Sequence, residues 1–309
     1  MIKIADSHSD FLARGVIDDD EDRLYDHADL QRMQQGGVAL QVFAVWVPPD
    51  TIDKLALGLK QIDYYHTFIK QSHGVITPCL STDCLKQNDG IHAILAIESG
   101  ESIDCRNDYI AYVYNQGARL LSLTWNGVND YASGCHESGG LNPRGIEAIH
   151  ILNDLCMALD VSHLNEQGFW EALDLYEHAP CATHSCVYEL NPVPRNLKKQ
   201  QIDCIIQRKG YIGINFYTEF LRGGSYATID DVLDHIEYVL DCGGEDAVGF
   251  GSDFCGIQYT PEGLISVADF QKLPQAMIRR GYSDSLISKI CYGNFASFIL
   301  KFLKQKQGV

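Results

Sequence analysis

Short apolar runs rich in β-branched residues alternate with longer amphipathic stretches from one end of the chain to the other. This alternation is typical of βα units arranged around a parallel sheet. Each run is followed by enough chain for a helix, and a set of eight favours a closed (β/α)₈ barrel over an open, doubly wound sheet. The runs comprise residues 2–9, 38–47, 93–99, 120–125, 159–163, 181–185, 211–217 and 247–254.

The stretches between the runs carry the apolar periodicity of helices. The last one, residues 283–304, predicts one or two helices that close the exterior of the barrel. Because we find no repeat, low-complexity tract or linker, we expect one domain over residues 1–309. Two loops rich in Gly, Ser and Tyr, residues 127–140 and 218–228, are candidates for covering an active site.

The charge balance narrows the possible partners. The chain has 24 Lys and Arg against 41 Asp and Glu, a formal net charge of −17, which would repel phosphate backbones and anionic lipids. We therefore expect neither nucleic acid nor a membrane surface as a partner. The N-terminus lacks signal-peptide features, and the longest apolar run, residues 38–47, is too short to span a membrane. These features predict a cytoplasmic protein.

The 11 cysteines are scattered from Cys79 to Cys291 and include no Cys-x-x-Cys pair. An odd number without paired spacing argues against a disulfide framework and against a thiolate zinc cluster. We therefore expect reduced and mostly buried thiols.

Polar residues at the ends of the apolar runs are the first candidates for chemistry, because catalytic groups of a barrel gather at the carboxyl ends of its strands. The first run ends in His8-Ser9-Asp10. Residues two apart on an extended chain point to the same side, so His8 and Asp10 could bind one cation. Taken alone, this pair is also typical of a strand-end turn.

Glu98 directly follows the apolar stretch 93–97. An uncompensated buried carboxylate costs several kcal/mol, so Glu98 should be paired, protonated or bound to metal. This segment alone leaves a metal and a salt bridge equally open. His163 and His184 end successive runs, and neighbouring parallel strands lie about 4.8 Å apart, close enough for both rings to share one ion.

Asp253 lies near the end of the last run and could shuttle protons for a metal-bound water. Together these strand ends offer carboxylates and imidazoles at one mouth, without a thiolate. Such ligands suit Zn²⁺ and are compatible with Mn²⁺, Co²⁺ or Fe²⁺. We expect two divalent ions about 3.5–4 Å apart, bridged by a carboxylate and a hydroxide, as in metal-dependent amide hydrolases.

A series of motifs in chain order matches a known family over nearly the full length. They are Asp6-Ser7-His8-Ser9-Asp10, His27-Ala28-Asp29-Leu30, Glu98-Ser99-Gly100, Leu123-Thr124-Trp125-Asn126, Gly140-Leu141-Asn142-Pro143-Arg144-Gly145, Asp160-Val161-Ser162-His163, Thr183-His184-Ser185, Pro194-Arg195-Asn196-Leu197 and Gly249-Phe250-Gly251-Ser252-Asp253-Phe254. With these motifs the chain resembles the renal (membrane) dipeptidase family of two-metal metallopeptidases, as a bacterial cytoplasmic-type member.

The resemblance implies a set of metal ligands. His8 and Asp10 would hold the first metal, His163 and His184 the second, and Glu98 would bridge them. The expected cofactors are therefore two divalent ions, and Zn²⁺ is the preferred metal.

The resemblance also implies a substrate and two residues that bind it. Arg195 would receive the terminal carboxylate of a dipeptide, and Asp253 would bind the substrate amine and transfer a proton. The implied activity is hydrolysis of short peptides by a metal-bridging hydroxide, chiefly dipeptides and including those with a D-residue at the second position. A small peptide is the expected partner, and a homo-oligomer is compatible with the sequence.

One position departs from the family pattern. The mammalian enzyme ends its fourth strand with Leu-Thr-His, whose imidazole contacts the substrate, whereas this chain has Trp125. An indole N–H donates one hydrogen bond but carries no proton, so the departure affects the range of substrates. Asn126 or His136 in the following loop could replace the missing donor, and we include Trp125 and Asn126 among the substrate-binding candidates.

Two other functions stay open at this point. One is a different barrel of the amidohydrolase type that acts on cyclic amides or related small molecules. Such barrels typically begin with His-x-His and often bridge their metals through a modified lysine, whereas this chain has His8-Ser9-Asp10 and ends its fourth run in Trp125. The other is a non-catalytic barrel that binds peptides, and intact candidates at all the metal positions argue against it.

Overall fold

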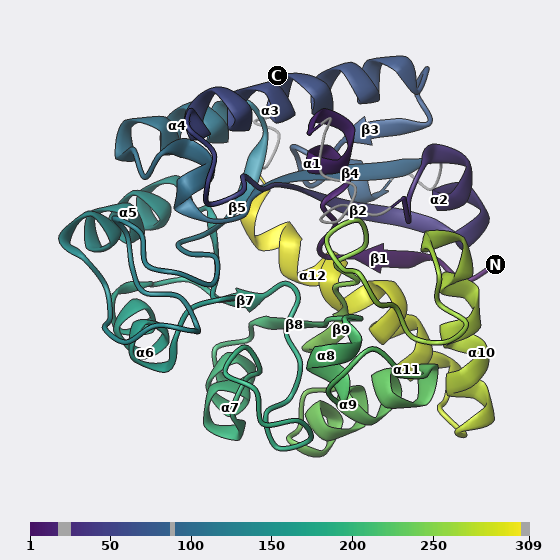
Figure 1. The fold of residues 1–309 in the computed structure, drawn as a ribbon. Coiled ribbons are helices and arrows are strands. Elements are labelled where there is room, and N and C mark those ends of the chain that lie inside the picture. Colours follow the sequence, from purple (N-terminus) through teal and green to yellow (C-terminus); the bar gives the residue numbers. More distant parts are fainter. Residues whose placement is uncertain (18–25, 87–89, 304–309) are drawn as a thin grey trace.

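The computed structural model describes residues 1–17, 26–86 and 90–303. Eight parallel strands pair in a closed ring, in the order β1, β2, β4, β5, β6, β7, β8, β9 and back to β1 (Figure 1). The predicted (β/α)₈ barrel is therefore confirmed, and each ring strand overlaps one of the predicted runs, although β4, β5 and β6 begin one or two residues before theirs. The ring strands are β1 (Ile4–Asp6), β2 (Val38–Val45), β4 (Ile91–Ile97), β5 (Ala118–Ser122), β6 (Ala158–Asp160), β7 (Cys181–Ala182), β8 (Tyr211–Ile214) and β9 (Val248–Phe250).

A further strand, β3 (Ile76–Pro78), lies outside the ring and was not predicted. It pairs with the start of β4, where Ile76 faces Ile91, whereas β5 pairs with the later part of β4, where Leu95 faces Ala118. β3 therefore pairs with the first part of β4, and β5 pairs with the part of β4 that follows. Its three residues are too short and too polar a stretch to stand out as an apolar run.

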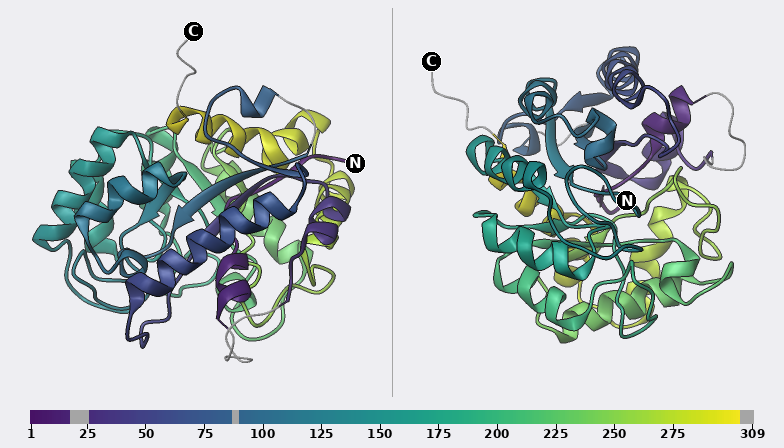
Figure 2. Two further views of the ribbon diagram at one scale, coloured as in Figure 1. Left: turned by 90° about the horizontal axis from the view of Figure 1, so that it is seen from above. Right: turned by 60° about the vertical axis from the view of Figure 1, so that its left-hand side comes forward.

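Helices surround the ring of strands, as the views in Figure 2 show. They cover the outward-facing strand residues, so the main apolar core lies between the barrel wall and the helix layer. The helices are α1 (Phe11–Val16), α2 (Leu30–Gly36), α3 (Lys54–Gln71), α4 (Asn107–Asn115), α5 (Pro143–Leu155), α6 (Glu166–Leu175), α7 (Lys199–Gln207), α8 (Thr218–Leu221), α9 (Ile229–Asp241), α10 (Lys272–Arg279), α11 (Asp284–Ser288) and α12 (Asn294–Ile299).

The inside of the barrel has its own apolar core, and α12 belongs to it. Leu40 and Val42 of β2 face this inner core, whereas Phe43 faces the helix layer. Phe295 of α12 packs on Tyr211 at the start of β8, with ring centroids 4.8 Å apart. The expectation that this C-terminal segment closes the exterior holds for α11, whose Ile287 packs in the outer core, but it is wrong for α12, whose aromatic side chains fill the amino end of the barrel. The end of the predicted stretch, Lys304, lies outside the described residues.

The cysteines follow the expectation with one exception. Cys79 and Cys84, at the end of β3 and the turn after it, form a disulfide. The prediction that all the thiols are reduced is wrong for this pair, because β3 and the following turn bring the two residues together. Nine other cysteines are free, and most of them are buried.

No helix in the described ranges combines the length and the apolar character that a membrane crossing requires.

Candidate metal centre

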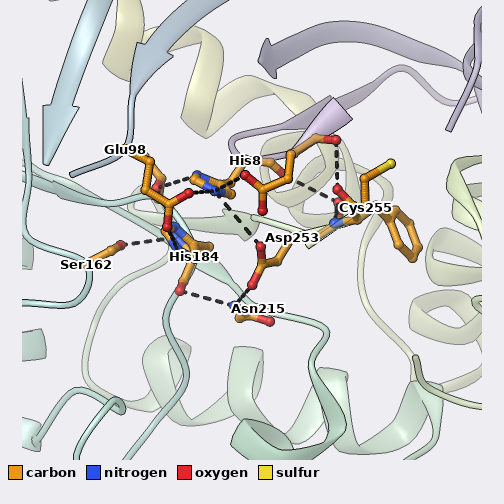
Figure 3. Close-up of polar contacts among 12 residues, drawn as sticks. His8, Glu98, Ser162, His184, Asn215, Asp253 and Cys255 are labelled. Carbon is orange, nitrogen blue, oxygen red and sulfur yellow. Dashed lines mark hydrogen bonds and ion pairs between the residues drawn. The ribbon is translucent and has the colours of Figure 1, made fainter. Parts of the chain in front are cut away.

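The strand ends gather the predicted ligands at one mouth of the barrel. Figure 3 shows His8, Glu98, His184 and Asp253 pointing toward one another. Each ligand side chain leaves the chain just beyond the last paired residue of its strand, so it turns into the mouth rather than into the ladder. The metal ligands predicted from the sequence are all buried: His8, Asp10, Glu98, His163 and His184.

The Glu98 carboxylate lies at the centre of the cluster. Its Oε2 atom is 3.2 Å from Nε2 of His8, and its Oε1 atom is 3.1 Å from Nε2 of His163 and 3.5 Å from Nε2 of His184. One carboxylate thus faces nitrogens from both sides. This is the arrangement that a carboxylate bridging two cations needs.

Hydrogen bonds behind the rings fix the tautomers of His163 and His184. Nδ1 of His163 lies 2.8 Å from Oδ1 of Asn126. Nδ1 of His184 lies 2.8 Å from Oγ1 of Thr183, whose hydroxyl donates to Asp160. Because both partner oxygens accept, both Nδ1 atoms carry the proton and both Nε2 atoms present a lone pair.

These two lone pairs face each other, since the Nε2 atoms of His163 and His184 lie 2.9 Å apart. Two acceptors at this distance repel each other unless a positive charge lies beside them. Oδ1 of Asp10 is buried and has no hydrogen-bond partner in the described part of the chain. Both features are satisfied by a divalent cation, so the donor set fits a metal.

The ligand atoms form overlapping groups of suitable size. His8, Asp10 and Glu98 form one group and Glu98, His163 and His184 another, each with its ligand atoms within 4.8 Å of one another. The two groups share Glu98. Asp253 joins His8 and His184 in a third group, with its Oδ1 atom 4.0 Å from Nε2 of His8.

The charged groups of the cluster shift one another's pKa values. Burial opposes the charge on His8, but the carboxylates of Glu98, Asp10 and Asp253 together outweigh it, with Glu98 contributing most, and raise the pKa of His8 to about 10. Burial, reinforced by the charge of Glu98, raises the pKa of Asp10 well above its ordinary range. In the metal-free protein a proton on His8 therefore supplies the positive charge that the carboxylates require. A divalent cation would supply it instead.

The second pair of histidines stays neutral. Burial, with the Arg195 guanidinium nearby, lowers the pKa of His163 to about 3. Burial, with the charge of His8, lowers the pKa of His184 well below its ordinary range. Neutral imidazole is the form that binds metal.

Arg195 is buried beside the cluster, although the sequence by itself indicated only a surface residue before a helix. Nη1 donates to Oγ of Ser185 and Nη2 to the backbone oxygen of His184, both at 2.7 Å. Within the described residues Arg195 forms no ion pair with a carboxylate, and its Nε atom has no hydrogen-bond partner. With His163 it lines a cavity of about 300 Å³. A buried guanidinium without a carboxylate can bind an anion.

Trp125, the position that departs from the family pattern, and Asn126 lie beside His163. Trp125 is half-buried, and its ring packs edge-on against Trp46 with the centroids 5.5 Å apart. Its centroid lies 6.2 Å from that of His163. Oδ1 of Asn126 accepts hydrogen bonds from Nδ1 of His163 and, at 3.3 Å, from the thiol of Cys135. His136 is exposed, so its ring is not brought to the cluster.

The two predicted covering loops differ in their relation to the site. Cys135 and Glu137 of loop 127–140 line the cavity beside Arg195. Loop 218–228 contains α8, whose Phe220 lies against the Arg195 guanidinium at 5.6 Å from the ring centroid.

Two polar groups near the site were not singled out from the sequence. One is the chain from Asp160 through Thr183 to His184 described above. The other is Asn215, just after β8, whose amide donates to Asp253 at 2.9 Å. Asn215 is a polar residue inside an apolar predicted run, and this was the available signal.

Comparison with known proteins agrees with this geometry. The model of the membrane dipeptidase family (peptidase family M19) matches residues 1–307. An uncharacterised protein of the pqqA 5′ region of Klebsiella pneumoniae is 33% identical over 264 residues, covering 81% of this chain and 96% of the relative. An uncharacterised dipeptidase of Schizosaccharomyces pombe is 30% identical over 316 residues, and the match covers 90% of this chain and 75% of the relative.

A solved structure supports the same family. A metallopeptidase from Rhodobacter sphaeroides, bound to a phosphinate mimic of the dipeptide L-Ala-D-Ala, superimposes with a TM-score of 0.89 at 26% identity. The match covers 97% of this chain and 99% of that one. The chain therefore belongs to the membrane dipeptidase family, and it is a metallopeptidase that hydrolyses peptide bonds on a (β/α)₈ barrel.

Proposed function

We propose that the whole chain, residues 1–309, is one zinc-dependent dipeptidase domain that holds two metal ions. The observation that carries this proposal is the position of Arg195. This buried guanidinium has no carboxylate partner among the described residues, and it donates a hydrogen bond of 2.7 Å to the backbone oxygen of the ligand candidate His184. A substrate carboxylate at Arg195 would leave room for little more than one residue before the metal centre, and this restricts hydrolysis to dipeptides.

The two groups of ligands that share Glu98 support two ions. His8 and Asp10 would hold one ion, His163 and His184 the other, and Glu98 would bridge them. The mixture of imidazole and carboxylate ligands supports Zn²⁺. Bound ions would lower the pKa of water, so that it attacks at neutral pH, and would polarise the scissile carbonyl.

Arg195 would bind the terminal carboxylate of the substrate through its planar fork. The cavity of about 300 Å³ beside it, which His163 also lines, can take the side chain of the second residue. The Rhodobacter sphaeroides metallopeptidase was solved with a mimic of L-Ala-D-Ala. We extend this substrate class to the present chain and include D-residues at the second position.

Asp253 would bind the substrate amine and pass a proton to the leaving amine. Its Oδ1 atom faces the cluster, 4.0 Å from Nε2 of His8, and its side chain is largely buried. Burial raises the pKa of Asp253, with Glu98 adding to this and the charge of His8 opposing it. A carboxyl group held in this way can accept and release a proton during turnover.

Trp125 and Asn126 take different parts in this proposal. Trp125 would offer its ring face to the substrate where other family members have imidazole. Asn126 would act through His163, by holding the proton of that ring on Nδ1. A cytoplasmic location is also part of the proposal. The nine free cysteines support it, whereas the Cys79–Cys84 disulfide is the exception.

An assay with matched substrates tests the function. Purified, Zn²⁺-loaded protein should hydrolyse L-Ala-L-Ala and L-Ala-D-Ala. It should hydrolyse the C-terminal amides of the same dipeptides at least about 100-fold less efficiently, because the amides lack the charge that Arg195 binds. Hydrolysis of cyclic amides without any dipeptide turnover would support the rival amidohydrolase function instead. Binding of dipeptides without turnover would support a non-catalytic barrel.

A further inference from the structure

Asn215 lies at the carboxyl end of β8 with no exposed surface. The backbone N–H of Tyr217 donates to its Oδ1 atom at 2.6 Å. This bond fixes the orientation of the amide, because a flipped amide would present N–H₂ to another donor. The Nδ2 atom of Asn215 must therefore face the mouth of the barrel, as Figure 3 shows.

The amide of Asn215 distinguishes the two oxygens of Asp253. Nδ2 donates to Oδ2 of Asp253 at 2.9 Å, whereas Oδ1 faces His8 at 4.0 Å. Oδ2 is thus held by Asn215, and Oδ1 is the oxygen that faces the cluster. Asp253 also has a positive φ of 61°, which residues other than glycine rarely adopt. Contacts with neighbouring residues must therefore hold the backbone of Asp253 in this conformation.

The same amide connects Asp253 to Arg195 through one backbone oxygen. The second N–H of Asn215 approaches the backbone oxygen of His184 at 3.4 Å, and Nη2 of Arg195 donates to that oxygen at 2.7 Å. The groups proposed for the two ends of a dipeptide are thus joined through the backbone of a metal-ligand candidate. Their separation is held by hydrogen bonds, independently of the substrate.

We propose that Asn215 is a positioning residue, which holds the Asp253 carboxylate with Oδ1 toward the substrate and keeps its distance from Arg195 fixed. This inference rests on the proposed function. Among the described residues, the side chain of Asn215 forms hydrogen bonds with Asp253 and with the backbone of His184 and Tyr217, and it is not among the residues that line the cavity beside Arg195. Its effect on turnover therefore passes through Asp253.

A double-mutant cycle tests this role. Asn215→Leu keeps the branched shape of the side chain and removes its three hydrogen bonds, to Asp253, His184 and Tyr217. It should lower kcat/KM for L-Ala-D-Ala roughly 10–100-fold, the usual loss when an outer hydrogen-bond partner is removed. The affinity for a phosphinate mimic of L-Ala-D-Ala, measured by calorimetry, should fall by a similar factor. Bound metal should stay at the wild-type level.

The cycle is completed with Asp253→Asn. Because Asn215 acts through Asp253, the variant Asn215→Leu/Asp253→Asn should lose no more activity or mimic affinity than Asp253→Asn alone. Asn294→Leu is the matched control. This buried asparagine donates to the backbone of Glu245 and Val248, away from the site, so its loss should cost stability while kcat/KM stays within threefold.

The outcomes separate the two proposals. Losses that multiply in the double variant, or a kcat/KM of Asn215→Leu within threefold of wild type, overturn the role of Asn215. If Asn215→Leu does not fold, Asn215→Ser, whose hydroxyl is too short to reach Asp253, carries the same cycle. Wild-type protein that hydrolyses no dipeptide contradicts the proposed function itself.

Discussion

The ring nitrogens Nε2 of His163 and His184 lie 2.9 Å apart, and each presents a lone pair to the other. The hydrogen bonds from Nδ1 to Asn126 and to Thr183 create this arrangement. Two neutral imidazoles held in this way are prepared for a cation. Asn126 and Thr183, which lie behind the rings, hold the two lone pairs directed at one point.

Removal of the partner of His163 should weaken metal binding. Asn126→Leu removes the acceptor for Nδ1, so the ring can rotate or change its tautomer. We expect roughly 10–100-fold weaker metal affinity, measured by competition with a chelator. Asn126→Asp keeps an acceptor at the same place and is the control, which should retain the affinity. An Asn126→Leu affinity within twofold of wild type would show that the bond does not orient the ring.

Arg195→Lys should separate binding from chemistry. Lysine keeps the charge but loses the planar fork that binds a carboxylate through two bonds. We expect KM for dipeptides to rise about 100-fold, equivalent to about 3 kcal/mol, with kcat within tenfold. The slow hydrolysis of dipeptide amides should not change. An unchanged KM for dipeptides would place the carboxylate site elsewhere.

Trp125→Phe should have little effect. Phenylalanine keeps an aromatic ring against Trp46 and removes only the indole N–H. If Trp125 contributes its ring face, kcat/KM for L-Ala-D-Ala should stay within threefold of wild type. A loss of more than tenfold would instead assign the indole N–H a hydrogen bond to the substrate.

The stability of the protein should fall in mild acid because of His27. Burial lowers the pKa of His27 from 6.5 to about 4, and its Nδ1 atom accepts the backbone N–H of Cys255 at 3.1 Å. Between these values the unfolded chain binds a proton that the folded protein does not. The free energy of unfolding should therefore decrease as pH falls from 6.5 toward 4, by at most roughly 3 kcal/mol.

Urea unfolding at several pH values checks this against His27→Asn. Asparagine keeps an acceptor for Cys255 and does not titrate in this range. The difference in unfolding free energy between wild type and His27→Asn should shrink or reverse as pH falls below 6.5. A difference that stays constant from pH 7.5 to 4.5 would assign the acid sensitivity to other groups.

The ring strands could be predicted because each one is an apolar run buried on both faces, and such runs are visible without tertiary information. The ends of the runs were less certain. Residues such as His8 and His184 leave the ladder to face the site, so β1 and β7 are shorter than their apolar runs. β3 was not predicted, because it has only three residues and is a strand only through its pairing with β4.

The ligand candidates could also be predicted, because strand order alone brings the strand ends to one mouth. Thr183 and Asn215 could not, since their roles depend on the directions in which their side chains point. The same holds for α12, whose apolar face packs inside the barrel. Periodicity identifies such a face but not the surface that it covers.

Metal content measured together with dipeptide hydrolysis tests the central claim most directly. Wild-type protein, dialysed after loading with Zn²⁺, should retain two ions per chain and hydrolyse L-Ala-D-Ala. Glu98→Gln keeps the shape of the side chain but removes the charge at the centre of the cluster. It should retain at most one ion and lose more than about 100-fold of the activity. Two bound ions and full activity in Glu98→Gln would contradict the account.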